Sequence, residues 1–383
     1  MEKAACYSCP MPRRRGSRFF PVAGRIRAAT APFLAAVAMG AVLSFQACSP
    51  ARSAYEAGGK ADRAELSELY GLLGEADKNP VQRFAALRQI SSNLMRAREY
   101  GRLAALLSSL DAIDAAVSPG GAADPYGAWY LFTAAYAYEQ DGSAPIAAIY
   151  YDRALKERPD TMVDGRSLHR ECLSRLIAIV DSPERRIGYY KDLIARFPDE
   201  ASDGSTLFLL AKEYERVGDW DLAVKTYSEF LPFFDAAIPG YPDAFRYARG
   251  IVDLYNSPKD WVYQDLQVLV GKVRSALAEG DSNRLRNYRA KVNFFASGWH
   301  SDEADSNARA LFDFGEFMAG KRINAASELD SGSNRREAYL KTWGWADKLS
   351  TWYFCFRKVY FPADPEIHGS WEWAGIYFGE KTQ

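Results

Sequence analysis

Residues 128–159 constrain the fold more than any other stretch of this chain, because they combine two helical spacings with two helix breaks. Apolar and small residues recur every three or four positions before Asp141 and again after Gly142, which places them on one face of each helix. Gly142 interrupts the first spacing, and Pro159 ends the second because proline cannot continue a helix. The stretch therefore predicts two short helices folded into a hairpin, which approach each other closely where alanines meet.

The order of large and small residues in this hairpin resembles the tetratricopeptide repeat (TPR), a helix-turn-helix unit of about 34 residues. The positions that match the signature of the repeat are Leu131, Ala134, Ala135, Tyr138, Ala147, Tyr151, Ala154 and Pro159. Leu131 stands where the family favours tryptophan, and Ala135 stands where it favours glycine. The resemblance implies an array of such units, because a single unit cannot bury its own apolar face.

The same pattern returns on both sides of this hairpin. The second-best match covers residues 203–234, and its signature positions are Leu207, Leu210, Ala211, Tyr214, Ala223 and Tyr227. Weaker helix pairs and single helices are expected over residues 62–76, 84–110, 166–198, 242–256 and 258–279. We therefore predict a mainly α chain, with a TPR-like α-α superhelix over residues 62–280.

The last hundred residues change from helical to extended patterning. Helical spacing continues over 282–299 and 304–321, but residues 350–361 and 370–379 are rich in aromatic and β-branched side chains. Because a Pro/Asp/Gly loop separates these two stretches, they predict an aromatic antiparallel hairpin. We expect a small α+β C-terminal domain over residues 281–383, whose hairpin is covered on both sides or lines a pocket.

The N-terminal 47 residues combine seven basic residues and one acidic residue with an apolar run over 28–45. A basic region, an apolar core of this size and small residues at its end are typical of a secretory signal peptide. An uncleaved membrane anchor is the alternative, because the apolar run is near the length of a membrane span.

The end of this segment resembles the lipobox of bacterial lipoproteins at Leu43, Ala47 and Cys48, with departures at Phe45 and Gln46. The resemblance implies a signal peptide over 1–47, lipidation of Cys48 and export to the cell envelope, on its periplasmic face or surface. Residues 48–61 are small and polar, and we expect them to form a flexible tether. Without lipidation, cleavage a few residues later would release a soluble protein.

The net charge and the cysteines exclude some classes of function. Removal of the basic N-terminal segment leaves a net charge of −7 on the remaining chain, which argues against nucleic acid as a partner. Cys172 lies on an apolar helical face, so we expect a buried free thiol. The distant Cys355 gives no spacing that supports a disulfide with it.

Catalytic and metal-binding patterns are incomplete. His169 lies one helical turn from Cys172, but no third group is placed to orient a nucleophile and its base. Asp364, Glu366 and His368 share the hairpin loop, but one histidine and two carboxylates form an incomplete metal site. We therefore expect no enzyme activity and no cofactor.

The resemblance to TPR proteins also implies a binding surface, because in that family the first helix of each pair lines a concave face. By position, this groove would contain Trp129, Phe132, Tyr136, Glu139, Phe208, Lys212, Glu215 and Arg216. Exposed aromatic residues in such a groove would mark an interaction site. The alternative is that they are buried against a neighbouring helix, or under the loop at residues 118–127.

Taken together, the sequence predicts a membrane-anchored, exported TPR scaffold that binds another envelope protein or peptide through its concave face. The alternative function is binding of a small molecule, a lipid or a glycan by the aromatic C-terminal domain. The predicted anchor would be the lipid on Cys48.

Overall fold

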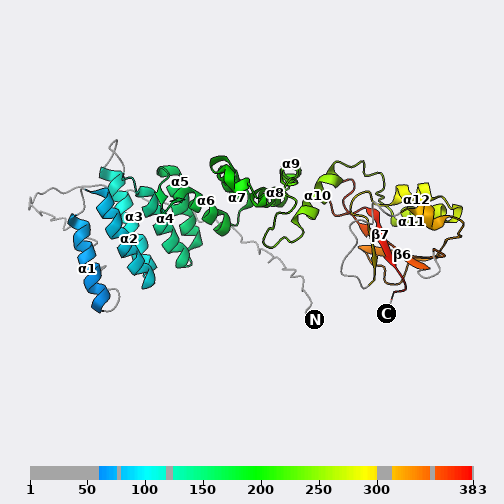
Figure 1. Ribbon diagram of the computed structural model, residues 1–383, viewed down its shortest axis with the longest axis horizontal. Coiled ribbons are helices and arrows are strands. Elements are labelled where there is room, and N and C mark those ends of the chain that lie inside the picture. Colours follow the sequence, from blue (N-terminus) through cyan, green and yellow to red (C-terminus); the bar gives the residue numbers. More distant parts are fainter. Residues whose placement is uncertain (1–59, 76–78, 118–123, 300–312, 346–349, 382–383) are drawn as a thin grey trace, which may run out of the picture. The chain divides into compact units, whose positions relative to one another are not determined.

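The computed structural model describes residues 60–75, 79–117, 124–299, 313–345 and 350–381 (Figure 1). The predicted signal peptide, Cys48 and nearly all of the predicted tether lie outside these residues. Across the described part of the chain, no helix is both long and apolar enough to cross a membrane.

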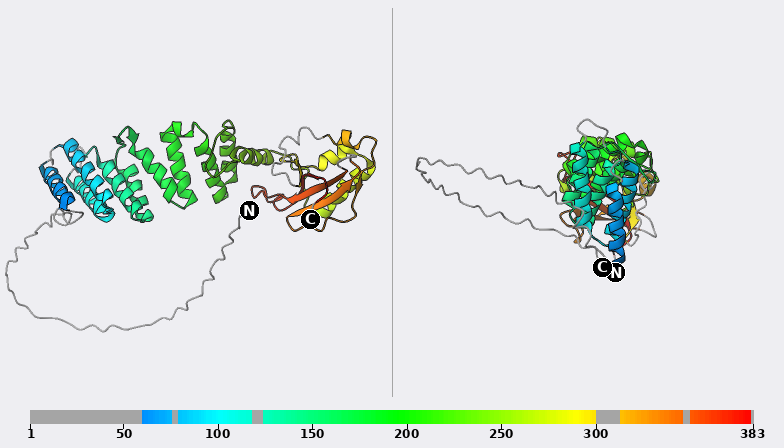
Figure 2. Two further views of the ribbon diagram at one scale, coloured as in Figure 1. Left: turned by 60° about the horizontal axis from the view of Figure 1, so that its bottom comes forward. Right: turned by 90° about the vertical axis from the view of Figure 1, so that its left-hand side faces the viewer.

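The first part of the described chain, residues 60–255, is built from helices that pack on their neighbours in sequence, and we call it the helical array (Figures 1 and 2). Its helices are α1 (Lys60–Glu75), α2 (Pro80–Arg96), α3 (Tyr100–Val117), α4 (Gly127–Gln140), α5 (Ala144–Glu157), α6 (Leu168–Ile179), α7 (Pro183–Arg196), α8 (Ser205–Val217), α9 (Trp220–Phe230) and α10 (Ala244–Tyr255). A short hairpin, β1 (Met162–Val163) and β2 (Arg166–Ser167), precedes α6, and a 3-10 turn (Pro198–Ala201) precedes α8.

Local signals in the sequence set the ends of these helices. The Asn79 side chain accepts a hydrogen bond from the backbone N–H of Val81, and Pro80 occupies the first turn of α2. At the C-terminal end of α8, Gly218 takes a left-handed conformation with φ 79° and ends the helix. Asp219 then caps α9 through Leu222 N–H. The predicted helix pairs are therefore confirmed as elements, although their ends shift by a few residues.

The contact between α4 and α5 is lined by small residues, as the sequence predicted. Ala134 and Ala135 of α4 and Ala147 and Ala154 of α5 have no exposed surface. Tyr151 is also fully buried, and it packs with Ala135 in the same core cluster. Because alanine side chains are short, the two helices can approach closely and surround the larger ring.

The second part of the chain is a five-stranded sheet with short helices. Its elements are α11 (Leu266–Glu279), α12 (Ser282–Tyr288), β3 (Phe295–Gly298), α14 (Phe314–Met318), β4 (Asn324–Ala325), β5 (Glu337–Trp343), β6 (Thr351–Lys358) and β7 (Trp371–Phe378). The strand order is β3-β7-β6-β5-β4. The prediction of a mainly helical chain with a small sheet region near its C-terminus is confirmed, including the antiparallel pairing of β6 with β7.

Two expectations for this part of the chain were wrong or incomplete. The helical spacing over 282–299 predicted one helix, but α12 ends at Tyr288 and Phe295–Gly298 form β3, which pairs in parallel with β7. The strand β5, antiparallel to β6, was not predicted. The helix α11, which we expected at the end of the array, shares one apolar core with the sheet through Leu269, Val273 and Trp373. This packing joins α11 to the sheet.

Candidate interaction surfaces

Two of the four aromatic residues expected in the groove are buried. Trp129 is 8% exposed, and its ring meets Phe84 of α2 edge-on, with ring centroids 5.1 Å apart. Phe84 stacks on Tyr126 at the start of α4, at 3.9 Å. Phe208 has no exposed surface and lies against Tyr227 and other rings. Trp129 and Phe208 therefore belong to the core, and burial against neighbouring helices is the alternative that holds for them.

Phe132 and Tyr136 of α4 are half-buried. The Phe132 ring packs on Tyr151 of the following helix at 5.6 Å, which makes it part of the contact between α4 and α5. The Tyr136 ring instead faces α6, where the Arg175 guanidinium lies 5.2 Å from its centroid. Tyr136 is therefore the aromatic residue of the predicted set on α4 that stays at the surface without joining a core cluster.

Glu139 and Arg175 join α4 to α6. Arg175 donates a hydrogen bond of 3.1 Å to Glu139 Oε1, and Tyr151 donates one of 2.9 Å to Oε2. The Glu139 side chain is 17% exposed and that of Arg175 is 40% exposed. Burial and the hydrogen bond to Glu139 raise the pKa of Tyr151, so its hydroxyl keeps its proton.

Lys212 and Glu215 make the corresponding contacts between α8 and α10. Lys212 pairs with Glu215 and donates a hydrogen bond of 3.1 Å to Tyr247 Oη, while the Tyr247 hydroxyl donates one of 2.7 Å to Glu215 Oε1. Burial and then the hydrogen bond to Glu215 raise the pKa of Tyr247 to about 12. Glu215 is 9% exposed, whereas Tyr247 is 41% exposed.

Arg216 completes the set on α8. It donates a hydrogen bond of 2.7 Å to Glu213 and a longer one of 3.4 Å to the Asp181 carbonyl oxygen, in the turn between α6 and α7. Glu213 is 5% exposed and also pairs with Arg186 of α7 at 3.2 Å. Arg216 itself is 47% exposed.

These contacts form two groups, one around Glu139 on α4 and α6 and one around Glu215 on α8 and α10, and we call the two together the polar strip. It consists of Tyr136, Glu139, Arg175, Lys212, Glu213, Glu215, Arg216 and Tyr247. Along it, the carboxylates lie inside and bridge successive helices, while the cations and Tyr247 are the more exposed groups. Sequence reasoning missed Arg175 and Tyr247, because the pairs that contain them match the repeat signature too weakly for positions to be transferred. It also did not place Glu213 in the groove.

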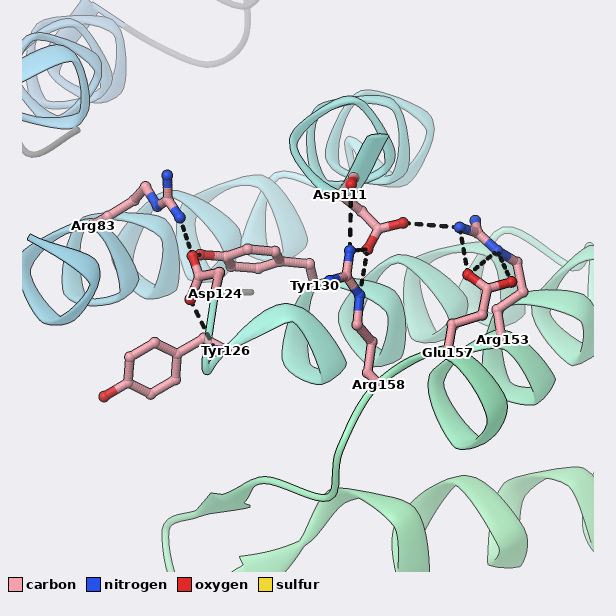
Figure 3. A network of polar contacts seen from close by, with 8 residues as sticks. All are labelled: Arg83, Asp111, Asp124, Tyr126, Tyr130, Arg153, Glu157 and Arg158. Atoms are coloured by element: carbon pink, nitrogen blue, oxygen red, sulfur yellow. Dashed lines mark hydrogen bonds and ion pairs between the residues drawn. The ribbon is translucent and has the colours of Figure 1, made fainter. Parts of the chain in front are cut away.

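Two buried aspartates connect α2, α3, α4 and α5 (Figure 3). Asp111 of α3 accepts hydrogen bonds of 2.8 Å from Arg153 and 3.1 Å from Arg158 Nε. Asp124 accepts one of 2.6 Å from the Tyr130 hydroxyl and pairs with Arg83 of α2. Both carboxylates are nearly inaccessible to water, and breaking such pairs is strongly destabilising.

The side chains that were weighed as catalytic groups are buried and make contacts within the fold. The His169 Nε2–H donates a hydrogen bond of 3.1 Å to the Ala154 carbonyl oxygen, and its Nδ1 contacts Arg196. Cys172 and Cys355 are buried free thiols, which confirms the expectation for Cys172. Burial raises the pKa of the Cys355 thiol to about 12, so it is not a poised nucleophile. Within the described residues, no group of three metal-ligating side chains is found.

Most of the predicted aromatic hairpin forms the core of the sheet. Trp345 stacks on Trp352 with centroids 4.1 Å apart, and Phe354 stacks on Trp373 at 4.2 Å. The opposite face of the sheet carries a second set of rings, from Tyr339, Tyr353, Tyr377 and Trp299. The hairpin is thus packed on both faces.

Comparison with solved structures finds chains that are similar to part of this one. No family model matches the chain, and no curated protein matches it. A crystal structure of BtubC (BKLC) from P. vanneervenii is similar over 51% of this chain and 84% of that chain, with 17% sequence identity and a TM-score of 0.33.

Proposed function

We propose that this chain is an exported, membrane-anchored TPR-type scaffold that binds another envelope protein or peptide through the polar strip. The exposure pattern of the strip supports this proposal most directly. Carboxylates such as Glu215 are buried and paired within the array, whereas Arg175, Arg216 and Tyr247 remain accessible to solvent. Arginine and tyrosine are enriched at protein interfaces.

The outward chemistry of the strip also indicates the kind of partner. Accessible guanidinium groups form charge-assisted, often bidentate hydrogen bonds with carboxylates. The exposed ring of Tyr247 adds contact area at a low entropy cost, because it has few rotatable bonds. An acidic protein segment with apolar side chains fits these groups better than a basic one.

Charge reversal on the strip tests the proposal. The bait is the chain from residue 50 onward, which forms one compact unit, with the double substitution Arg175→Glu and Arg216→Glu. We expect this variant to lose at least about tenfold of the partner that the unchanged bait captures from the native envelope fraction, because two charged contacts become repulsive.

The matched control carries Lys191→Glu and Lys225→Glu, two exposed positions on the second helices α7 and α9. It should capture the partner as the unchanged bait does. Circular dichroism should show both variants folded. A folded Arg175/Arg216 variant that retains the partner would exclude the polar strip as the binding surface.

The anchor is tested separately, because the scaffold and its attachment can fail independently. In cells given labelled palmitate, the full chain should incorporate the label and sediment with membranes. The Cys48→Ser variant should lose the label, since the thiol is the acceptor of the lipid. Label retained in that variant would exclude Cys48 as the lipidation site.

A further inference from the structure

The face of the sheet opposite its main core carries four rings that we call the aromatic cage: Trp299, Tyr339, Tyr353 and Tyr377. The Trp299 ring stacks on Tyr377, with centroids 4.4 Å apart and an interplanar angle of 12°. Its edges meet Tyr339 at 5.5 Å and Tyr353 at 5.2 Å. The indole N–H donates a hydrogen bond of 3.2 Å to the Gly379 carbonyl oxygen, which fixes the orientation of the ring.

An ammonium group of the chain itself lies against this cage. Lys381 Nζ is 5.3 Å from the Trp299 centroid and 5.0 Å from the Tyr339 centroid. The same nitrogen is 3.3 Å from Asp330 Oδ1. Two ring faces and a carboxylate around one nitrogen are the groups that bind a cation in proteins.

The two carboxylates near the aromatic cage are each paired with a lysine of the chain. Lys341 is held by Glu380 at 2.9 Å and lies 5.8 Å from the Tyr353 centroid. Hydrogen bonds, first from Gly332 N–H and then from Lys381, lower the pKa of Asp330, so its carboxylate is ionised at neutral pH. If Lys381 leaves, Asp330 and the rings would accept another cation without burying an unpaired charge.

We propose that the aromatic cage is a binding site for a trimethylammonium group, and that Lys381 occupies it as an intramolecular competitor. A lysine ammonium is compact and strongly hydrated, and the Lys381 side chain is 35% exposed. A trimethylammonium group is larger and less hydrated, so it gains more from the ring faces. This inference does not depend on the scaffold function.

Gly332 borders the place that the Lys381 ammonium occupies. A methyl group at this position would collide with the Lys381 ammonium and touch the Asp330 carboxylate. The ammonium is the far end of a flexible side chain and can move away, but the methyl group then fills part of the space that a bound cation needs. Glycine at position 332 therefore keeps this space open.

The experiment is calorimetric titration of the chain from residue 50 onward with choline, and with its neutral isostere 3,3-dimethylbutanol. We expect weak choline binding by the unchanged chain. Lys381→Ala should bind choline about tenfold more tightly, because the competitor is removed. In the Lys381→Ala background, Gly332→Ala should weaken choline binding, because its methyl group enters the space of the bound cation. Gly271→Ala, on α11 with no neighbour near its added methyl group, is the matched control and should behave as the unchanged chain.

Further variants keep the result interpretable. In the Lys381→Ala background, Trp299→Leu should abolish choline binding, and Asp330→Asn should weaken it. Thermal melts establish that each variant is folded, and Tyr339→Phe, which keeps the ring, should retain binding. If the unchanged and Lys381→Ala chains bind choline with equal affinity, Lys381 does not compete for the cage. If the neutral isostere binds as tightly as choline, the cage does not select a cation.

A vesicle assay identifies the source of the group. If the Lys381→Ala chain sediments with phosphatidylcholine vesicles and not with phosphatidylglycerol vesicles, the ligand is a lipid headgroup. If it binds choline and ignores both kinds of vesicle, the ligand is a small molecule. Absence of choline binding in the folded Lys381→Ala chain contradicts both.

Discussion

The helical array and the sheet differ in what fills their interiors. In the array, alanines bring helices together, and buried carboxylates such as Asp111 and Asp124 pair with arginines from neighbouring helices. In the sheet, stacked rings such as Trp345 on Trp352 fill the core. The buried Glu372 of the sheet, held by Trp261 and Arg357, is an exception there.

This difference teaches where a partner can bind. Some ion pairs between helices, such as Arg175 with Glu139, leave the cation at the surface, so the array presents charged groups in fixed positions. In the sheet, rings also line the face opposite the core, where Lys381 lies against them. The polar strip and the aromatic cage follow from these two ways of packing.

The largest effect is expected when a buried charge of the array loses its partner. Asp111→Ala should lower the free energy of unfolding by about 3–5 kcal/mol, because Arg158, with 8% exposure, loses its carboxylate. Asp253→Ala, which breaks the exposed pair with Arg249 within α10, should cost about 0–1 kcal/mol. Chemical denaturation measures both, and equal losses would show that burial does not distinguish these pairs.

A loss of similar size is expected in the sheet for a different reason. Trp373→Ala removes a fully buried ring that stacks on Phe354, and should cost about 3–5 kcal/mol through lost transfer energy and a cavity. Trp343, which is 41% exposed, serves as the control, and its substitution by alanine should cost less than about 1 kcal/mol. If Trp373→Ala were as mild, the stacked rings would not hold the sheet together.

The smallest expected effect is the pH dependence of the free energy of unfolding that comes from His169 in the helical array. Burial, and then the Arg196 guanidinium, lower the pKa of His169. The unfolded chain therefore binds a proton that the folded chain does not, once the pH falls below about 6.5. The free energy of unfolding should be unaffected by His169 above that pH and should decrease as the pH falls through the lowered pKa of the folded state.

The slope from this single histidine is at most about 1.4 kcal/mol per pH unit. His169→Gln should remove it from denaturation curves measured between pH 7 and pH 5. An unaltered slope in His169→Gln would contradict the assignment.

Much of the helical part could be predicted because its signals are local. The spacing of apolar residues determines helices locally, and Pro80 and Gly142 set helix ends within a few residues. The aromatic and β-branched residues of β6 and β7 likewise indicate strands locally. The strand β3 was missed because its pairing with β7 joins Phe295 to Gly375, a contact that no local spacing reveals.

The candidate site was less predictable, because burial depends on neighbours far away in sequence. Trp129 lies against Phe84 of another helix, and Phe208 is enclosed by rings that include Tyr241 after α9. Lys212 and Glu215 were placed on the right helix, but their pairing with each other and with Tyr247 required the structure.

The most direct measurement is site-specific photo-crosslinking in the native envelope. A photoreactive amino acid replaces Tyr136 or Arg216 on the polar strip, or Lys191 or Lys225 on the second helices. We predict that the two strip positions crosslink to the same acidic envelope protein and that the other two do not. Crosslinks from Lys191 and Lys225 alone would place the partner on the other face of the helical array and contradict the proposed function of the strip.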